Sequence, residues 1–263
     1  MQKYSSRFQT LPKEISQIEI LPYIEPKDLD AYCLGNPQLE NWCRMPENIE
    51  TYLELRHVNR FIYDANQGLA FAAENGSEML INYFLYCGAN KYDKAMAYAA
   101  GEGHRNIVER MLSLGARHYK WAMEAAAGRG HQEIVERMIE MTSKNEEDSM
   151  DYNEAMAYAA EEGHQKMVER MLALGATDYN LSMGFAARGG REEIVNQMLA
   201  LGATNYNWAL AMAAEGGQFL IVKQMLDLGA NDYDHAITQA KERGYREIAK
   251  FLKKNPSRRK NKF

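Results

Sequence analysis

The sequence predicts an all-α protein, a solenoid of about seven helix-turn-helix repeats preceded by a small helical N-terminal domain. Three observations predict this fold class. A pair of small residues followed by a glycine recurs at a nearly constant period, apolar residues within each period follow helical spacing, and a glycine closes most units. A unit this short cannot bury its apolar face alone, so neighbouring units must stack to build a continuous core.

The repeat is recognised by an alanine pair and the glycine three residues after it. Seven registers share this pattern, the last one degenerate, and they begin at Ala72, Ala99, Ala126, Ala159, Ala186, Ala213 and Ala240. Successive registers are 27 residues apart, except that 33 residues separate the third from the fourth. In the longer unit, 119–151, an acidic segment at 142–151 replaces the usual short Gly-Ala junction. It is interpreted as a surface insertion, or as a bend or partner contact.

Each unit is expected to contain two helices. A tyrosine followed by Asn or Asp opens the first helix, and the polar residue is predicted to be its N-cap, at Asp93, Asn153, Asn180, Asn207 and Asp234. Lys120 breaks this rule in the third unit. The second helix carries apolar residues at helical spacing, such as Ile107, Val108 and Met111. Left-handed C-cap residues are predicted at Gly88, Gly115, Gly175, Gly202 and Gly229.

These motifs resemble those of the ankyrin-repeat family over about 190 residues, with the repeat stack spanning 61–254. The family pattern stands here as Met96, Ala99-Ala100, Gly103-His104, Ile107-Val108, Met111-Leu112 and Gly115-Ala116. The family's Thr-Pro is absent, and each repeat is about six residues shorter than the usual 33, at the place where ankyrin repeats build a hairpin. In this shortened form the chain is similar to ankyrin arrays of large DNA viruses. The resemblance implies a module that binds proteins.

The N-terminal segment, 1–60, lies outside the period. Leu-Pro-x-Glu-Ile at 11–15, an apolar run and Pro-x-Asp-Leu at 26–29 resemble an F-box. That resemblance implies docking on the adaptor subunit of a cullin-type ubiquitin ligase through Leu11, Pro12, Glu14, Ile15, Ile18, Leu21 and Ile24. Pro22 inside the second helical run and a spacing one residue too long depart from the family pattern. The alternative is a helical cap that covers the apolar end of the stack.

Composition restricts the classes of partner. The chain has a net charge of −5, but its last 23 residues hold ten Lys or Arg and two Glu, so the rest is strongly acidic. An acidic body argues against nucleic acid along the repeats. The three cysteines, Cys33, Cys43 and Cys87, form no disulfide framework, which indicates a reducing compartment. No apolar run is long enough for a membrane span. We expect a cytoplasmic monomer, whose basic tail, 255–263, is disordered and either directs nuclear import, contacts anionic partners or is simply solvated.

Chemical motifs are not recognisable, so no enzyme, cofactor or metal site is expected. The Gly-x-Gly pairs at 101–103 and 128–130 recur with the repeat and are interpreted as turns between helices, not as phosphate loops. His104, His131 and His164 follow the turn glycines, where the ankyrin resemblance implies a hydrogen bond to neighbouring backbone. Histidines one repeat apart do not converge on a metal.

Positions that vary between repeats are candidates for reading a target. The residue after the predicted cap and the pair before the turn glycine vary most, and the ankyrin resemblance places such positions on the concave side. The predicted target-binding residues are Lys94, Glu102, Trp121, Arg129, Glu154, Glu162, Leu181, Arg188, Trp208 and His235. Trp and Arg often dominate interface energetics. The alternative is neutral variation, with the tryptophans covering gaps left by the shortened repeat.

A second stripe recurs within the first helices and is expected to pack in the core between repeats, although its exposure would indicate a binding patch. It comprises Phe71, Tyr98, Tyr158, Phe185 and Met212.

These interpretations lead to two alternative functions. In the first, the chain is a substrate-recruiting adaptor that holds a ubiquitin ligase at its N-terminus and a target protein on its repeats, raising their effective concentration. In the second, it is a stand-alone scaffold or inhibitor whose N-terminal segment is only a cap.

Overall fold

A computed structural model describes residues 28–29, 49, 52, 64–143 and 151–254. Within these residues the fold is all-α, with fourteen helices in seven helix-turn-helix pairs and no strand, as the sequence predicts. The chain divides into two compact units, Met1–His118 and Tyr119–Phe263. The predicted ligase-docking residues, the core of the acidic insertion and the basic tail lie outside the described residues.

Along each of these two compact units, the first helix of a repeat is followed by its second helix, and then by the first helix of the next repeat. The first unit contains α4 (Ala65–Glu74), α5 (Glu78–Tyr86), α6 (Tyr92–Glu102) and α7 (Arg105–Leu114). The second contains α8 (Tyr119–Gly128), α9 (Gln132–Ser143), α10 (Asn153–Glu162), α11 (Gln165–Ala173), α12 (Tyr179–Gly189), α13 (Glu192–Ala200), α14 (Tyr206–Glu215), α15 (Phe219–Asp227), α16 (Tyr233–Glu242) and α17 (Arg246–Lys254).

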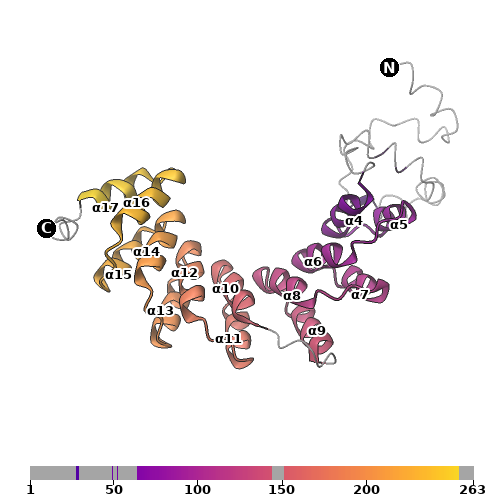
Figure 1. Cartoon of the computed structure of the whole chain (residues 1–263), viewed down its shortest axis with the longest axis horizontal. Coiled ribbons are helices and arrows are strands. Elements are labelled where there is room, and N and C mark those ends of the chain that lie inside the picture. The colour runs from indigo at the N-terminus through magenta and orange to yellow at the C-terminus, as the bar shows by residue number, and fades with distance from the viewer. Residues whose placement is uncertain (1–27, 30–48, 50–51, 53–63, 144–150, 255–263) are drawn as a thin grey trace, which may run out of the picture. The chain divides into compact units, whose positions relative to one another are not determined.

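In the second unit the first helices of successive repeats pack directly on one another. Figure 1 shows α8, α10, α12, α14 and α16 side by side in one layer, with the second helices forming another layer. The alanine pairs explain the close approach: Ala126, Ala127, Ala159 and Ala160, for example, are all fully buried. Small side chains bring helix axes together, and methionines such as Met156 fill the space left between the layers.

The predicted N-caps are wrong by two residues in most repeats. The residue before the tyrosine caps the helix instead: Asp178 accepts from the amide of Leu181, Asn205 from that of Trp208, and Asp232 from that of His235. The residues predicted as caps lie inside the helix, where most of their side chains contact the next repeat. Local capping rules identify residue types that suit both positions, which is why they misplace the cap.

An Asn or Asp in each of five first helices forms hydrogen bonds with the backbone of the junction that leads into the following repeat. The Oδ1 atom of Asn153 accepts from the backbone amides of Thr177 and Asp178, both at 2.8 Å. The same pair of bonds recurs 24 and 25 residues ahead for every member of the set, which we call the junction ladder: Asn66, Asp93, Asn153, Asn180 and Asn207.

One of the two first-unit members of the junction ladder, Asp93, is an aspartate whose ionisation reflects these bonds. Burial alone would raise the pKa of Asp93, but the amides of His118 and Arg117 donate to its carboxylate and lower that pKa below the ordinary value. The carboxylate therefore stays ionised and keeps both bonds near neutral pH.

Lys120 interrupts the junction ladder in α8, one helix before the acidic insertion. The short Gly-Ala junction that follows the second helix in other repeats is replaced in the sequence there. The Lys120 ammonium instead lies 3.5 Å from the Glu124 carboxylate and 3.7 Å from that of Glu154. Lys120 thus departs from the repeat rule in the same repeat, 119–151, whose junction is altered.

The second helices are also joined across repeats, by ion pairs. The Arg170 guanidinium of α11 forms two hydrogen bonds with the Glu136 carboxylate of α9, at 2.7 and 2.8 Å. Arg110 and Glu78 make the corresponding contact in the first unit. Both pairs are partly exposed, so each contributes modestly to stability.

The five glycines predicted as left-handed C-cap residues all have positive φ, as the sequence predicts: Gly88, Gly115, Gly175, Gly202 and Gly229. At Gly115, for example, φ is 111° and its amide donates to the carbonyl of Leu112. A side chain at this φ would be strained, which explains why glycine recurs here.

Core packing of the second stripe is only partly confirmed. Met212 is buried and Phe185 is half-buried, but Tyr98 and Tyr158 are 38% and 40% exposed. The α8 member of this register is Ala125, which leaves one side of Tyr158 without an aromatic neighbour from the preceding repeat. Among the described residues, no helix is long and apolar enough to cross a membrane.

Candidate functional site

The predicted target-binding residues fall into separate groups. Lys94 and Glu102 belong to α6 in the first unit, where the Lys94 ammonium lies 5.8 Å from the centre of the Tyr98 ring. In the second unit, Trp121, Arg129 and Glu162 line one pocket, and Glu154 lies beside it. Leu181, Arg188, Trp208 and His235 lie on α12, α14 and α16, further along the same layer.

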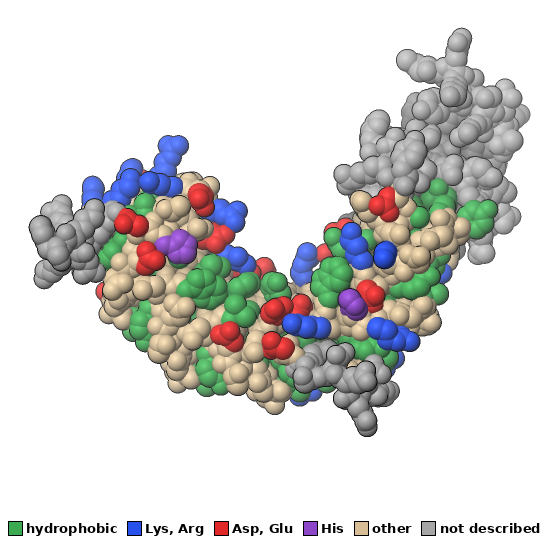
Figure 2. Space-filling model, viewed as in Figure 1, with side chains coloured by type: hydrophobic (Ala, Val, Ile, Leu, Met, Phe, Trp, Pro, Cys, Tyr) green, Lys and Arg blue, Asp and Glu red, His purple; other side chains and the backbone are tan. Residues whose placement is uncertain are grey.

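Figure 2 shows hydrophobic and acidic side chains next to one another over the first helices of the second unit, whereas Lys and Arg gather near α16 and α17. The basic end reflects the composition of the last helix, which contains Lys250, Lys253 and Lys254. The mixed apolar and acidic stretch is therefore the part of this layer best suited to a basic partner.

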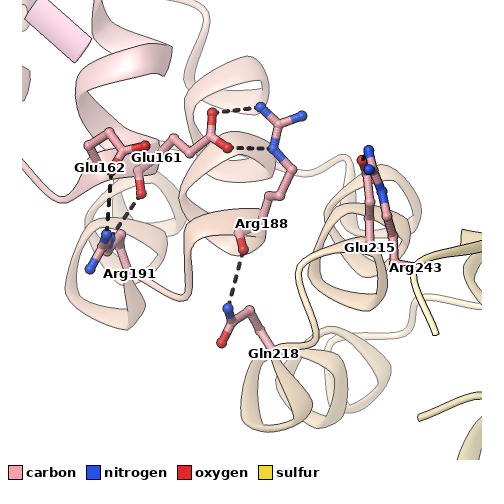
Figure 3. Close-up of polar contacts among 7 residues, drawn as sticks. All are labelled: Glu161, Glu162, Arg188, Arg191, Glu215, Gln218 and Arg243. Atoms are coloured by element: carbon pink, nitrogen blue, oxygen red, sulfur yellow. Dashed lines mark hydrogen bonds and ion pairs between the residues drawn. The ribbon is translucent and has the colours of Figure 1, made fainter. Parts of the chain in front are cut away.

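Arg188 has an internal partner, which the sequence did not reveal. Its guanidinium makes two hydrogen bonds of 2.6 Å with the Glu161 carboxylate of α10, and it stacks over the Phe185 ring at 4.6 Å. Figure 3 shows this pair between neighbouring first helices. The bonds to Glu161 raise the pKa of Arg188 above its ordinary value. Arg188 therefore joins two repeats, whatever else it contacts.

The same network continues on either side of Arg188 (Figure 3). Arg191 donates to the Glu161 carbonyl at 2.9 Å, and Gln218 donates to the Arg188 carbonyl at 3.3 Å. These two residues take the place that follows the turn glycine, where three other repeats carry histidine. In the first unit, His104 lies 3.1 Å from the Glu74 carbonyl in the same way, so the hydrogen bond to neighbouring backbone implied for this histidine is present.

Two glycines in the variable pair before the turn belong to the scaffold. A Cβ atom on Gly189 would lie 1.9 Å from the Glu161 carbonyl oxygen, and one on Gly216 would lie 1.9 Å from the Arg188 carbonyl oxygen. The backbones of successive first helices meet at these points, so no side chain can be accommodated. The residues at these two positions therefore vary between repeats partly because of helix packing, and not only because of contacts with a target.

The two tryptophans have different environments. Trp208 lies over Gly184, where an added Cβ atom would be 1.9 Å from the indole ring, and its ring centre is 6.2 Å from that of Phe185. Phe185 in turn meets Tyr158 edge-on at 5.6 Å. Trp208 thus covers a gap left by a small residue, whereas Trp121 is 43% exposed at a pocket.

The pocket lies between α8 and α10 and has a volume of about 290 Å³. Its lining combines two exposed aromatic rings, three carboxylates, a guanidinium and small residues: Trp121, Glu124, Ala125, Gly128, Arg129, Tyr158, Glu161 and Glu162. Two positions explain why it is open. Ala125 replaces the aromatic residue or methionine found in most repeats, and Gly128 takes the position held by Glu161 and Arg188 in the next two. We call this the α8–α10 pocket.

Glu124 is the unusual residue of the α8–α10 pocket. Its register holds Ala70, Ala97, Ala157, Gly184, Ala211 and Thr238 in the other repeats. The Glu124 side chain is 12% exposed, and its Oε1 atom is buried without a hydrogen-bond partner, although the Lys120 ammonium is 3.5 Å away. Burial, followed by the neighbouring Glu154 carboxyl, raises the pKa of Glu124 to about 7, against the opposing effect of Lys120.

Glu124 and Ala125 were not predicted as site residues, whereas Tyr158 belongs to the stripe whose exposure would indicate a binding patch. The signal was present, because each register can be compared along the repeats. Such a comparison singles out Glu124 as a charged residue among small ones and Ala125 as a small residue among large ones. Buried charge and missing volume at adjacent positions are both costly to stability, which makes their combination a useful indicator of a site.

Metal chemistry finds no support in the described part of the chain, where no group of three or more His, Cys, Asp or Glu side chains is placed to hold an ion. Of the two Gly-x-Gly pairs predicted as turns, Gly103 and Gly130 have φ values of 80° and 77° and lie in the turns. Gly101 and Gly128 instead lie inside α6 and α8. The arrangement is suited to contacts with another molecule through a side chain-sized pocket and its surroundings.

Comparison with known proteins identifies the repeat. Residues 69–148 match the family model described as ankyrin repeats (3 copies). The ankyrin repeat domain of human ASB11 is a similar solved structure, with 19% sequence identity, a TM-score of 0.43, and coverage of 72% of this chain and 98% of that one. No curated protein matches the sequence.

Stacked helix-turn-helix pairs within each of the two units are the arrangement of a repeat solenoid. Within residues 69–148 the match is to ankyrin repeats, a type of repeat that indicates a protein–protein interaction module.

Proposed function

We propose that the chain holds a target protein on the first-helix layer of its second unit, around the α8–α10 pocket. The observation that carries this proposal is the juxtaposition of exposed Trp121 and Tyr158 with a pocket that interrupts an otherwise filled register. Partly exposed aromatic rings beside a concavity are typical anchors of protein interfaces. Glu154 and Glu162, 51% and 56% exposed, add a polar rim.

A peptide selected by the full chain from a random display library tests the position of this surface. Its affinity is measured by calorimetry for the natural sequence, for Trp121→Ala and for Leu220→Ala. Leu220 is a matched control because it is 64% exposed and lies on α15, a second helix. Trp121→Ala is expected to weaken binding about tenfold or more, the effect of removing an aromatic anchor. A peptide sensitive to Leu220→Ala alone would place the binding surface on the other layer.

The proposed role of the bound target is recruitment to a ubiquitin ligase through the N-terminal segment. This part of the proposal is supported by the resemblance of residues 11–29 to an F-box. Leu29, the last residue of that pattern, is fully buried and Asp28 is exposed. Tethering ligase and target to one chain would raise their effective concentration without any bond chemistry in the chain itself.

A pull-down against the recombinant F-box-binding adaptor distinguishes the adaptor from a stand-alone scaffold or inhibitor. The double variant Leu11→Ala, Pro12→Ala is expected to lose adaptor binding while its melting temperature stays within about 3 °C, because docking residues are solvent-facing before they bind. If the segment is only a cap, the unchanged chain does not bind the adaptor, and the double variant melts at a clearly lower temperature.

A further inference from the structure

We propose that the α8–α10 pocket receives an arginine side chain of the target protein. The inference rests on the proposed function, since it presumes that the first-helix layer holds a protein, and it adds the chemistry of the residue that anchors that protein.

The size of the pocket is the first argument. About 290 Å³ lies at the lower end of the range of small-molecule sites and is sufficient for one long side chain. The opening has two aromatic walls, Trp121 and Tyr158, and the Glu124 carboxyl lies among the lining residues. A planar cation that stacks on rings and donates several hydrogen bonds matches both features, and guanidinium has that combination.

In the neighbouring repeat, the protein brings the same combination of groups together within its own chain. Arg188 stacks over Phe185 and bonds the Glu161 carboxylate through two nitrogens. One repeat earlier, Glu161 stands in the position of Arg188 and Gly128 in that of Glu161, so these positions supply no guanidinium to the α8–α10 pocket. The aromatic rings there are Trp121 and Tyr158, and the carboxyl is that of Glu124. A guanidinium supplied by another molecule would complete there the arrangement that Arg188 completes within the chain.

The third argument is the state of Glu124 itself. Its Oε1 atom is buried without a hydrogen-bond partner and has only the Lys120 ammonium nearby, at 3.5 Å, in a register where every other repeat has Ala, Gly or Thr. Burying such an atom is costly. An incoming guanidinium would donate to this atom and replace water around the carboxyl. Glu161 and Glu162 already pair with Arg188 and Arg191 within the chain, so Glu124, beside Lys120, is the lining carboxyl that a guest cation would meet.

The experiment uses the full chain labelled with 5-fluorotryptophan, so that Trp121 reports on the pocket by fluorine NMR. Its signal is assigned as the one missing from Trp121→Phe. The probe is the capped tripeptide acetyl-Gly-Arg-Gly-amide. The matched ligand is acetyl-Gly-citrulline-Gly-amide, which has the same shape without the charge. We expect a saturable shift of the Trp121 signal with the arginine peptide and binding at least about tenfold weaker with citrulline, the loss of a charge-assisted contact.

Ala125→Phe is the decisive variant, because it fills the pocket with a residue that the same register carries at Phe71 and Phe185. It is expected to abolish the saturable shift while its melting temperature stays at or above that of the natural chain. Glu124→Gln keeps the shape, removes the charge and is expected to weaken the arginine peptide about tenfold. No saturable shift, an equal response to citrulline, or a response that persists in Ala125→Phe would overturn the inference.

The display-selected peptide separates this inference from the proposed function. If that peptide needs Trp121 but binds equally well when each of its arginines is replaced by citrulline, the first-helix surface stands and the arginine anchor is wrong. If it is indifferent to Trp121, the proposed surface fails, whereas the tripeptide titration still decides whether the pocket accepts guanidinium.

Discussion

Replacing Asn180 with alanine tests whether the junction ladder holds successive repeats together. Its Oδ1 atom accepts from the amides of Thr204 and Asn205, both at 2.8 Å, and both bonds are exposed. A net hydrogen bond is worth about 0.5–1.5 kcal/mol, and water can replace these two, so Asn180→Ala should reduce the free energy of unfolding by about 1–2 kcal/mol. For a chain of this size that corresponds to a fall in melting temperature of about 2–8 °C.

The effect should also be local, which amide hydrogen exchange can resolve. Thr204 and Asn205 are expected to exchange faster in Asn180→Ala, while the amide of Thr177, bonded by Asn153 in the preceding repeat, keeps its rate. Asn180→Asp is the matched control because Asp93 makes the same pair of bonds in the first unit. The reasoning is refuted if Asn180→Ala leaves stability and both exchange rates unchanged, or if Asn180→Asp is equally damaging.

Three further predictions concern residues at or near the candidate site. Gly216→Ala should lower the free energy of unfolding by more than about 2 kcal/mol, because its Cβ atom would meet a carbonyl oxygen at 1.9 Å. Gly229→Ala has open space around the new Cβ atom and only the strain of a φ of 101°, so it should lower that free energy by about 1–2 kcal/mol. Urea unfolding of both variants measures the two values, and equal values would contradict the close backbone contact at Gly216. Arg188→Lys keeps the charge but loses the two-pronged pairing with Glu161, so it should lower the urea midpoint nearly as much as Arg188→Ala, by about 1 kcal/mol for a pair that is partly exposed; a lysine variant as stable as the natural chain would show that charge alone suffices. Glu124 has a folded-state pKa of about 7, above its unfolded value, so the stability it contributes is complete below about pH 4.5 and is lost as the pH rises through 7. Between pH 5 and 8 the urea midpoint should therefore fall less steeply for Glu124→Gln than for the natural chain. Identical slopes for the two chains would contradict the raised pKa.

The sequence predicted the repeat architecture because its determinants are local and recur. The alanine pairs, the turn glycines and the C-cap glycines such as Gly115 each serve one backbone conformation or one close approach, so their spacing alone defines the helix pairs. The N-caps were misplaced because Asn and Asp suit both a cap and the junction ladder. Only the 24-residue reach from Asn153 to Thr177 decides between the two, and that distance is set by the stacking of repeats.

The candidate site was predicted only in part, for a related reason. Variation identified Trp121, Arg129 and Glu162, which do line one pocket, but it also identified Arg188 and Trp208, which contact neighbouring repeats. In a single sequence, a position that varies because it contacts a target looks the same as one that varies together with its contact in the next repeat. The pocket depends on what is missing, an aromatic side chain at Ala125 and a long one at Gly128, and missing volume becomes visible only when the helices are placed.

Hydrogen–deuterium exchange of the full chain with its display-selected peptide tests the proposed surface most directly. We predict slower exchange in α8 and α10, on either side of the pocket, with unchanged exchange in α9 and α11, the second helices of the same two repeats. Protection confined to α9 and α11 would contradict the account, because the target would then lie on the layer opposite Trp121 and the α8–α10 pocket.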